Sequence, residues 1–176
     1  MSGTSRAGTG RVLLLVGRLA LAGIFLFAAY AKMKPQGSVQ WSVPAVKTSL
    51  LMFAMQVDSY QLLPPSTVSF VAKSLPLFEL FLGLWLLSGI WLRLSSLITT
   101  ILLGGFFGVM VRTYAMGLEI NCGCFGPGER LGPKSLLRDG SMLALALAVT
   151  IGAFLAARKK SSGAAASSPA ELQQAP

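Results

Sequence analysis

The sequence predicts an all-α integral membrane protein built as a four-transmembrane-helix bundle. Of its 176 residues, 53% are hydrophobic and only 12% are charged, whereas about one quarter of the residues in a soluble domain are charged. The mean hydropathy is +0.67. Four apolar stretches approach or exceed the roughly 20 residues that a helix needs to cross a bilayer core of about 30 Å.

These four stretches define a membrane domain over residues 12–157. The expected spanning helices lie at residues 12–31, 68–90, 94–111 and 133–157. We expect residues 1–11 to form a cytoplasmic N-terminal segment and the Ser- and Ala-rich residues 158–176 to form a disordered cytoplasmic tail. Gly104 and Gly108, in the third span, form a small-xxx-small pair that would let another helix approach closely.

A secretory signal peptide is the alternative interpretation of the first apolar stretch. A basic N-terminus precedes it, and Ala29-Tyr30-Ala31 resembles a cleavage site. However, the apolar run is longer than the ~7–15 residues of a signal h-region, and Arg18 interrupts it. We therefore expect a spanning helix.

The first long loop contains a further apolar segment at residues 45–57, which is too short to span. We expect it to form an interfacial helix on the periplasmic surface of the membrane. Four spans place both termini on one side, and basic residues are denser on the short segments of that side, which favours cytoplasmic termini. The protein is thus expected in a bacterial inner membrane with its cysteine loop in the periplasm.

The composition excludes several classes of function. There is no histidine, which excludes histidine-dependent triads, haem ligation by histidine and most zinc sites. The formal net charge of +9 does not indicate nucleic-acid binding, because the basic residues flank apolar segments instead of forming a stripe with aromatic residues. Anionic lipid headgroups are the simpler partner, so the lipid bilayer is the expected environment.

Both cysteines of the chain lie in the glycine-rich stretch at residues 121–128, where Gly123 separates Cys122 from Cys124. A Cys-x-Cys pair closes only a small, strained ring, and Gly123 is the residue best able to adopt the backbone angles it requires. Strained, exposed disulfides exchange readily, which is typical of catalytic or regulatory pairs. We favour redox chemistry over inert packing of small apolar thiols and over metal binding, and all three remain open here.

Several charged residues accompany the cysteines on the same side of the membrane. Arg112, Arg130 and Arg138 would lower a thiol pKa by stabilising the thiolate. Asp139 suits the N-terminal part of a helix by its interaction with the helix dipole, and it could alternatively take a proton from a thiol.

Glu79 is the most informative charge within the expected spans, because it lies ~16 Å from the inner end of its helix and hence near mid-membrane. We expect Arg18 to reach it from the first span. The pair would either lock two helices together or line a site where Glu79 carries protons or binds a quinone carbonyl, since intramembrane ionisable residues are functional candidates by default.

The chain resembles the MauE/DoxX group of small four-helix membrane proteins over about residues 11–157. The Cys-x-Cys-Phe-Gly loop is the most specific matching feature. The matching features are Arg18, Phe25, Ala31-Lys32, Tyr60-x-Leu62-Leu63-Pro64, Leu75-Pro76-x-x-Glu79-x-x-x-Gly83, Cys122-Gly123-Cys124-Phe125-Gly126 and Arg138-Asp139. The resemblance implies association with periplasmic thioredoxin-like partners and disulfide maturation, or, for DoxX-like relatives, quinone-linked sulfur oxidation.

These observations lead to one main hypothesis and two alternatives. The main hypothesis is a membrane thiol–disulfide oxidoreductase in which Cys122 and Cys124 exchange with a periplasmic thioredoxin-fold protein. A quinone, ubiquinone or menaquinone, would take up or supply the electrons near Glu79 and Arg18, and Cys124 would attack the partner. The alternatives are a non-enzymatic anchor or assembly factor for a periplasmic oxidoreductase, and a small transporter of reducing equivalents.

Overall fold

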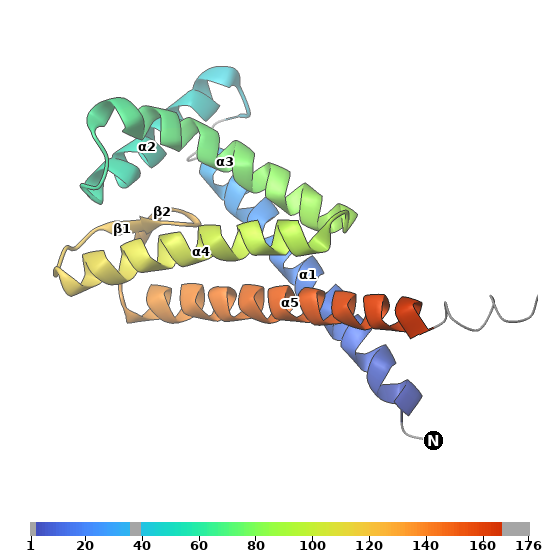
Figure 1. Ribbon diagram of the computed structural model, residues 1–176. Coiled ribbons are helices and arrows are strands. Elements are labelled where there is room, and N and C mark those ends of the chain that lie inside the picture. Colours follow the sequence, from blue (N-terminus) through green and yellow to red (C-terminus); the bar gives the residue numbers. More distant parts are fainter. Residues whose placement is uncertain (1–2, 36–39, 167–176) are drawn as a thin grey trace, which may run out of the picture.

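The computed structural model describes residues 3–35 and 40–166, which form five α-helices and one small β-hairpin (Figure 1). The elements in chain order are α1 (Gly3–Met33), α2 (Val43–Ser59), α3 (Pro65–Ser88), α4 (Leu92–Ala115), β1 (Asn121–Gly123), β2 (Gly126–Arg130) and α5 (Pro133–Ala166). The predicted all-α class is confirmed. The antiparallel hairpin β1–β2 holds the two cysteines.

Four of the helices are long and apolar enough to cross a membrane, which confirms the predicted four-span architecture. The candidate spans are Gly10–Met33, Pro65–Ser88, Leu92–Ala115 and Pro133–Arg158. Most ends lie a few residues beyond the predicted bounds, because the helices continue into polar flanking residues. Many large apolar side chains on these helices are exposed, as expected for a surface that faces lipid; examples are Leu13, Phe81 and Ile151.

The ends of the chain are more helical than predicted. The helix α1 begins at Gly3, within the segment expected to precede the first span. The helix α5 continues to Ala166, so the prediction of a disordered tail is wrong for residues 158–166. Alanine, lysine and arginine are good helix formers, and this stretch contains no proline that would stop the helix. The remainder of the predicted tail, residues 167–176, lies outside the described residues.

The predicted helix in the first long loop is present as α2, and it is longer than the expected residues 45–57. Ser42 caps its N-terminus, because the Ser42 hydroxyl accepts a hydrogen bond from the backbone N–H of Ala45 at 3.3 Å. Its buried Phe53 packs against Ala72 and Leu75 of α3. The helix α2 therefore covers the N-terminal half of α3.

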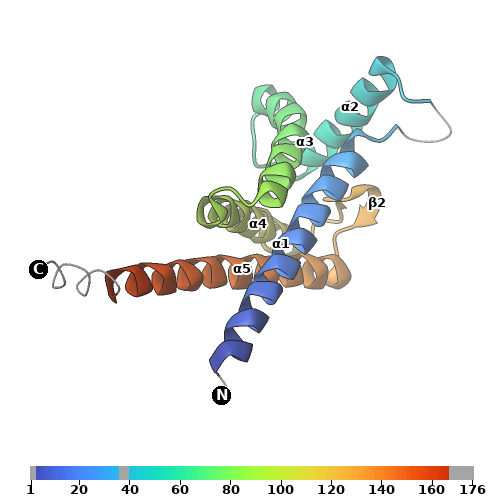
Figure 2. The same cartoon turned by 90° about the vertical axis from the view of Figure 1, so that its right-hand side faces the viewer.

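Close packing of α1 on α3 and α5 forms the core of the bundle. Figure 1 shows α4 and α5 running side by side, with α1 crossing α5, and Figure 2 shows the same crossing from the side. The apolar core at this crossing consists of Leu21, Ala22, Leu86, Ala146 and Val149. From their connecting turn, α3 and α4 diverge (Figure 1).

Close glycine contacts occur at other positions than expected. A Cβ atom at Gly108 would meet nothing within 4 Å, and one at Gly104 would meet only Leu143 at 3.9 Å. The predicted close helix approach at this pair is therefore not present within the described chain. Instead, a Cβ atom at Gly83 of α3 would lie 2.9 Å from Leu26 and 3.3 Å from the carbonyl oxygen of Ala22, both in α1.

We expect the substitution Gly83→Ala to destabilise the bundle by about 1–3 kcal/mol, the usual cost of overpacking a close contact. Gly108→Ala is the matched control: it adds the same methyl group to a neighbouring span, where the space is open. Thermal melting of the purified protein in detergent measures both. A melting temperature of Gly83→Ala equal to or above that of Gly108→Ala would contradict the packing of α1 on α3.

Candidate functional site

The hairpin β1–β2 positions both cysteines between the helices. Cys122 lies in β1, and Cys124 lies in the turn before β2. Between them, Gly123 has a φ of +71°, in the left-handed region that favours glycine, and a Cβ atom there would lie 2.8 Å from the side-chain oxygen of Gln56. The backbone conformation therefore favours glycine, and a side chain at this position would also displace the Gln56 side chain of α2.

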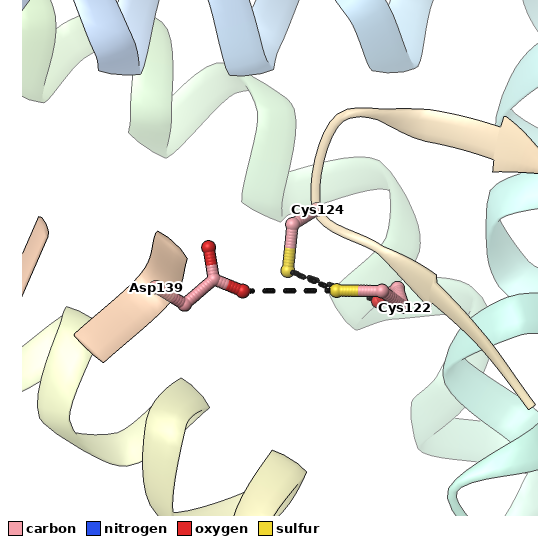
Figure 3. A group of neighbouring side chains, drawn as sticks. All are labelled: Cys122, Cys124 and Asp139. Atoms are coloured by element: carbon pink, nitrogen blue, oxygen red, sulfur yellow. Dashed lines mark hydrogen bonds between the residues drawn. The ribbon is translucent and has the colours of Figure 1, made fainter. Parts of the chain in front are cut away.

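The two thiols are free and lie next to each other. Their sulfur atoms are 3.0 Å apart, so a disulfide bond, with an S–S distance of about 2.05 Å, requires an approach of roughly 1 Å. Cys122 is buried with 4% exposure, whereas Cys124 is partly exposed. Figure 3 shows that Asp139 of α5 points toward the pair, and its carboxylate lies 3.8 Å from the Cys122 sulfur. This geometry suits a pair that forms and breaks a disulfide bond.

The two thiols differ in acidity. The pKa of Cys122 is lowered, chiefly by the hydrogen bond from the Cys124 side chain and further by a backbone hydrogen bond of Cys124 and the charge of Arg138, against burial and the Asp139 carboxylate. The pKa of Cys124 is raised by its hydrogen bond to Cys122 and by burial. In the reduced pair, Cys122 is therefore the thiol that ionises first, and Cys124 keeps its proton.

Arg138 organises the charges around the Cys122 sulfur. One of its guanidinium nitrogens lies 3.9 Å from this sulfur, and another binds the two carboxylate oxygens of Glu129 at 2.5 and 2.6 Å. The guanidinium also bonds Asp139 at 3.2 Å and lies 4.5 Å from the centre of the Phe125 ring. Arg138 thus ties β2 and the hairpin turn to α5.

Tyr60 belongs to the site, although its residue type gives no reason to predict this from the sequence. Its hydroxyl donates a hydrogen bond of 2.8 Å to the backbone carbonyl of Cys122. Burial raises the pKa of Tyr60, and the nearby Cys122, Cys124 and Asp139 raise it further, so the phenol stays protonated. Its place in the Tyr-x-Leu-Leu-Pro motif of the family resemblance is the only signal in the sequence that could have identified it.

Glu79 is paired with Lys32, so the expected pairing with Arg18 is wrong. The Lys32 ammonium donates to both Glu79 carboxylate oxygens at 2.8 Å and to the backbone carbonyl of Cys124 at 2.9 Å. The side chains of Lys32 and Glu79 are only 3% and 8% exposed. The first span is expected to end at residue 31, before Lys32. The helix α1 instead continues to Met33, so Lys32 lies within the helix and is buried in the bundle.

Arg18 lies in the middle of α1, and its side chain reaches the C-terminal end of α3, away from the thiols. Its guanidinium contacts Gly89 and donates a long hydrogen bond of 3.4 Å to the carbonyl of Leu87. These residues end α3, where a helix dipole attracts a positive charge. The sequence also predicts Arg112 and Arg130 near the thiols. Arg112 is exposed at the end of α4, and Arg130 is exposed in β2. The arginine that contacts a thiol is Arg138. Neither Arg18 nor Arg112 lines the site.

Both thiols line a cavity of about 480 Å³. The polar residues of its lining lie around the thiols, and they are Lys32, Gln56, Tyr60, Glu79, Cys122, Cys124 and Asp139. The other lining side chains are apolar, including Phe25, Phe53, Leu102 and Phe106. This volume is within the roughly 300–1,000 Å³ of small-molecule sites, and the cavity presents reactive sulfur on the wall of a mostly apolar chamber.

The donor set is poorly suited to a metal ion. Among the described residues, Cys122, Cys124 and Asp139 have ligand atoms within 4.8 Å of one another, which provides three protein ligands. A structural zinc site needs four, and the Arg138 guanidinium beside the Cys122 sulfur repels a cation. The arrangement therefore fits thiol redox chemistry better than metal binding.

The buried Lys32–Glu79 pair gives a prediction for stability. Lys32→Met and Glu79→Leu should each destabilise the protein by about 3–5 kcal/mol, because each leaves one buried charge unpaired. The double variant should recover most of that loss, because both charges are gone. Thermal melting of the three variants in detergent is the measurement, and losses that add in the double variant would contradict the pairing.

The acidity of Cys122 gives a second prediction. Cys124→Ala should raise the pKa of Cys122, because it removes the hydrogen bond that stabilises the thiolate, whereas Asp139→Asn should lower it, because it removes a nearby negative charge. The pH dependence of thiolate ultraviolet absorbance, with Cys122→Ser as the blank, measures the change. A lower Cys122 pKa in Cys124→Ala and a higher one in Asp139→Asn would contradict the assignment of Cys122 as the more acidic thiol.

Comparison with known proteins provides one match. The family model described as methylamine utilisation protein MauE matches residues 10–152. No curated protein and no solved structure matches the chain. The matched segment contains the first three candidate spans in full and the fourth up to residue 152. It also contains the hairpin, both cysteines and the Lys32–Glu79 pair. The chain is therefore a multi-pass membrane protein that belongs to the MauE family.

Proposed function

We propose that this protein is a membrane thiol–disulfide oxidoreductase that exchanges electrons between a periplasmic thioredoxin-fold protein and the quinone pool. The observation that carries the proposal is the position of the two thiols: they are 3.0 Å apart and line a mostly apolar cavity within a membrane bundle. The family name, which refers to methylamine utilisation, is compatible with a role in maturing a periplasmic enzyme of that pathway.

The proposed orientation has cytoplasmic termini and the hairpin at the periplasmic face of a bacterial inner membrane. A disulfide that must exchange with a partner needs an oxidising compartment, which the periplasm provides. The helix α2 would then lie along the periplasmic membrane surface, and its exposed Leu51, Met52 and Met55 would contact lipid. The positive-inside distribution of the short segments supports the same orientation.

Exchange with the partner begins at Cys124. When the pair is a disulfide, a partner thiolate attacks the sulfur of Cys124, the less buried residue of the two. A bond forms between the partner and Cys124, the Cys122–Cys124 bond breaks, and Cys122 leaves as a thiolate. Cys122 is the better leaving group because its pKa is lowered. The second partner thiol then gives up its proton and attacks the partner sulfur of this mixed disulfide. The partner disulfide forms, the bond to Cys124 breaks, and Cys124 takes up the proton.

Reoxidation of the pair passes two electrons and two protons to the quinone. The Cys122–Cys124 bond forms again, and the quinone is reduced to the quinol. One proton comes from the Cys124 thiol, and the other is the proton that the partner dithiol released, for which the Asp139 carboxylate beside Cys122 is the nearest carrier. The overall reaction converts one partner dithiol and one quinone into a partner disulfide and a quinol, and the reverse direction uses the same contacts.

The buried charges have a positioning role in this scheme. The Lys32 ammonium holds the Cys124 carbonyl, and Glu79 holds Lys32, so Glu79 acts on the reaction through Lys32. This arrangement favours the expected helix-locking role of Glu79 over a role as proton carrier. Arg138 stabilises the Cys122 thiolate and anchors the hairpin through Glu129. Arg18, at the far end of the bundle, has no part in the quinone site.

The test is a pair of single-cysteine variants expressed in cells. In the reverse direction, Cys124 attacks the partner disulfide and Cys122 then displaces the partner from Cys124. Cys122→Ser removes this second step, so a dithiothreitol-sensitive adduct of Cys124 with an oxidised periplasmic thioredoxin-fold protein should accumulate. Cys124→Ser should give several-fold less adduct, because the remaining thiol is buried. Alkylation-quenched gel analysis with mass spectrometry identifies the adduct and its partner.

The outcomes separate the proposal from its alternatives. Absence of adduct in both variants, together with a wild-type pair that stays reduced in oxidising buffer, would refute thiol exchange. A stable complex with the partner that persists in the double Cys→Ser variant would instead favour the anchor or assembly factor. Net movement of a thiol compound across proteoliposomes without a partner would favour the transporter.

A further inference from the structure

We infer that the cavity opens sideways into the lipid and that an isoprenoid quinone enters there, with its ring toward Cys122 and its tail passing over Gly105 of α4. The inference rests on the proposed function, to which it adds the route and the residue at the opening. Among the described residues, four both line the cavity and are solvent-exposed. They are Leu62, Leu63, Ile101 and Gly105. The cavity therefore opens between the start of α3 and the middle of α4.

The depth of this opening selects a molecule dissolved in the membrane. Gly105 lies 13 residues after Leu92 and 10 residues before Ala115, the ends of α4. At about 1.5 Å per residue, it is roughly 20 Å and 15 Å from the two ends of the span. Ile101, which is 65% exposed, lies one turn away. The α4 side of the opening thus lies in the hydrocarbon region of the bilayer, where a water-soluble thiol compound or dithiol would not enter.

The shape and chemistry of the cavity fit a quinone with an isoprenoid tail. The two thiols on the cavity wall are suited to a ring that accepts electrons, while most of the lining consists of aliphatic and aromatic side chains. A volume of about 480 Å³ accommodates a ring and the first part of a tail. The rest of a long tail must leave the cavity, and an opening at hydrocarbon depth lets it stay in lipid.

Gly105 is the residue that keeps this opening wide. A Cβ atom at Gly105 would meet nothing within 4 Å, so the first atom of a larger side chain has open space there. Such a side chain would stand at the mouth of the cavity. Gly108 has the same open surroundings and is also exposed, but it does not line the cavity. The two glycines are therefore a matched pair, one at the opening and one beside it.

The experiment compares Gly105→Phe with Gly108→Phe in the full-length protein reconstituted in lipid nanodiscs. The Cys122–Cys124 pair is first reduced, and its reoxidation is followed by alkylation after addition of either decylubiquinone or a benzoquinone without a tail. We expect Gly105→Phe to slow reoxidation by decylubiquinone at least tenfold and reoxidation by the tail-less quinone much less. Gly108→Phe should match the wild type with both quinones. Reduction of the disulfide by dithiothreitol should be unchanged in both variants.

Each result has a distinct meaning. If the wild type is reoxidised by decylubiquinone and Gly105→Phe reacts at the same rate, the side opening is wrong while the proposed function stands. The same holds if Gly105→Phe and Gly108→Phe slow the reaction equally, or if both quinones are slowed equally. If neither quinone reoxidises the wild type, the quinone half of the proposed function fails, and the inference fails with it.

Discussion

The ammonium group of Lys32 is the interaction on which the site depends. It has three N–H donors, and two bind the carboxylate of Glu79 while the third binds the carbonyl of Cys124. A buried ammonium is costly unless all its donors are satisfied and its charge is balanced. In this protein both conditions are met by joining α1, α3 and the cysteine hairpin at one point. The position of the thiols relative to the bundle is therefore coupled to the register of α1 on α3.

That register is itself set by a small residue. The absence of a side chain at Gly83 lets the backbones of α1 and α3 approach, with Leu26 and the Ala22 carbonyl against it. Lys32 lies nearly two turns after Leu26, and Glu79 lies about one turn before Gly83, which brings the two charged groups together. At the other end of the same contact, Arg18 lies against Gly89 and the end of α3. One helix pairing thus places two basic side chains in different environments.

The electrostatics around the thiols make the two cysteines unequal. Arg138 lies near the Cys122 sulfur and also pairs with Glu129 and Asp139, so its positive charge is shared between the thiol and two carboxylates. Cys124 has a less favourable environment for ionisation and is the less buried residue of the two. Such asymmetry suits a pair in which one sulfur is attacked and the other leaves, as thiol exchange requires.

The sequence by itself determined the membrane class, the number of spans and the cysteine loop, because hydropathy, span length and the Cys-x-Cys spacing are local properties. It also singled out Glu79, since a carboxylate within an apolar span is conspicuous. Only the tertiary structure decided which cation pairs with Glu79, that Tyr60 and Glu129 belong to the site, and that Arg18 and Arg112 do not. Those outcomes depend on how far α1 extends and how α1 crosses α3, and no local pattern encodes either.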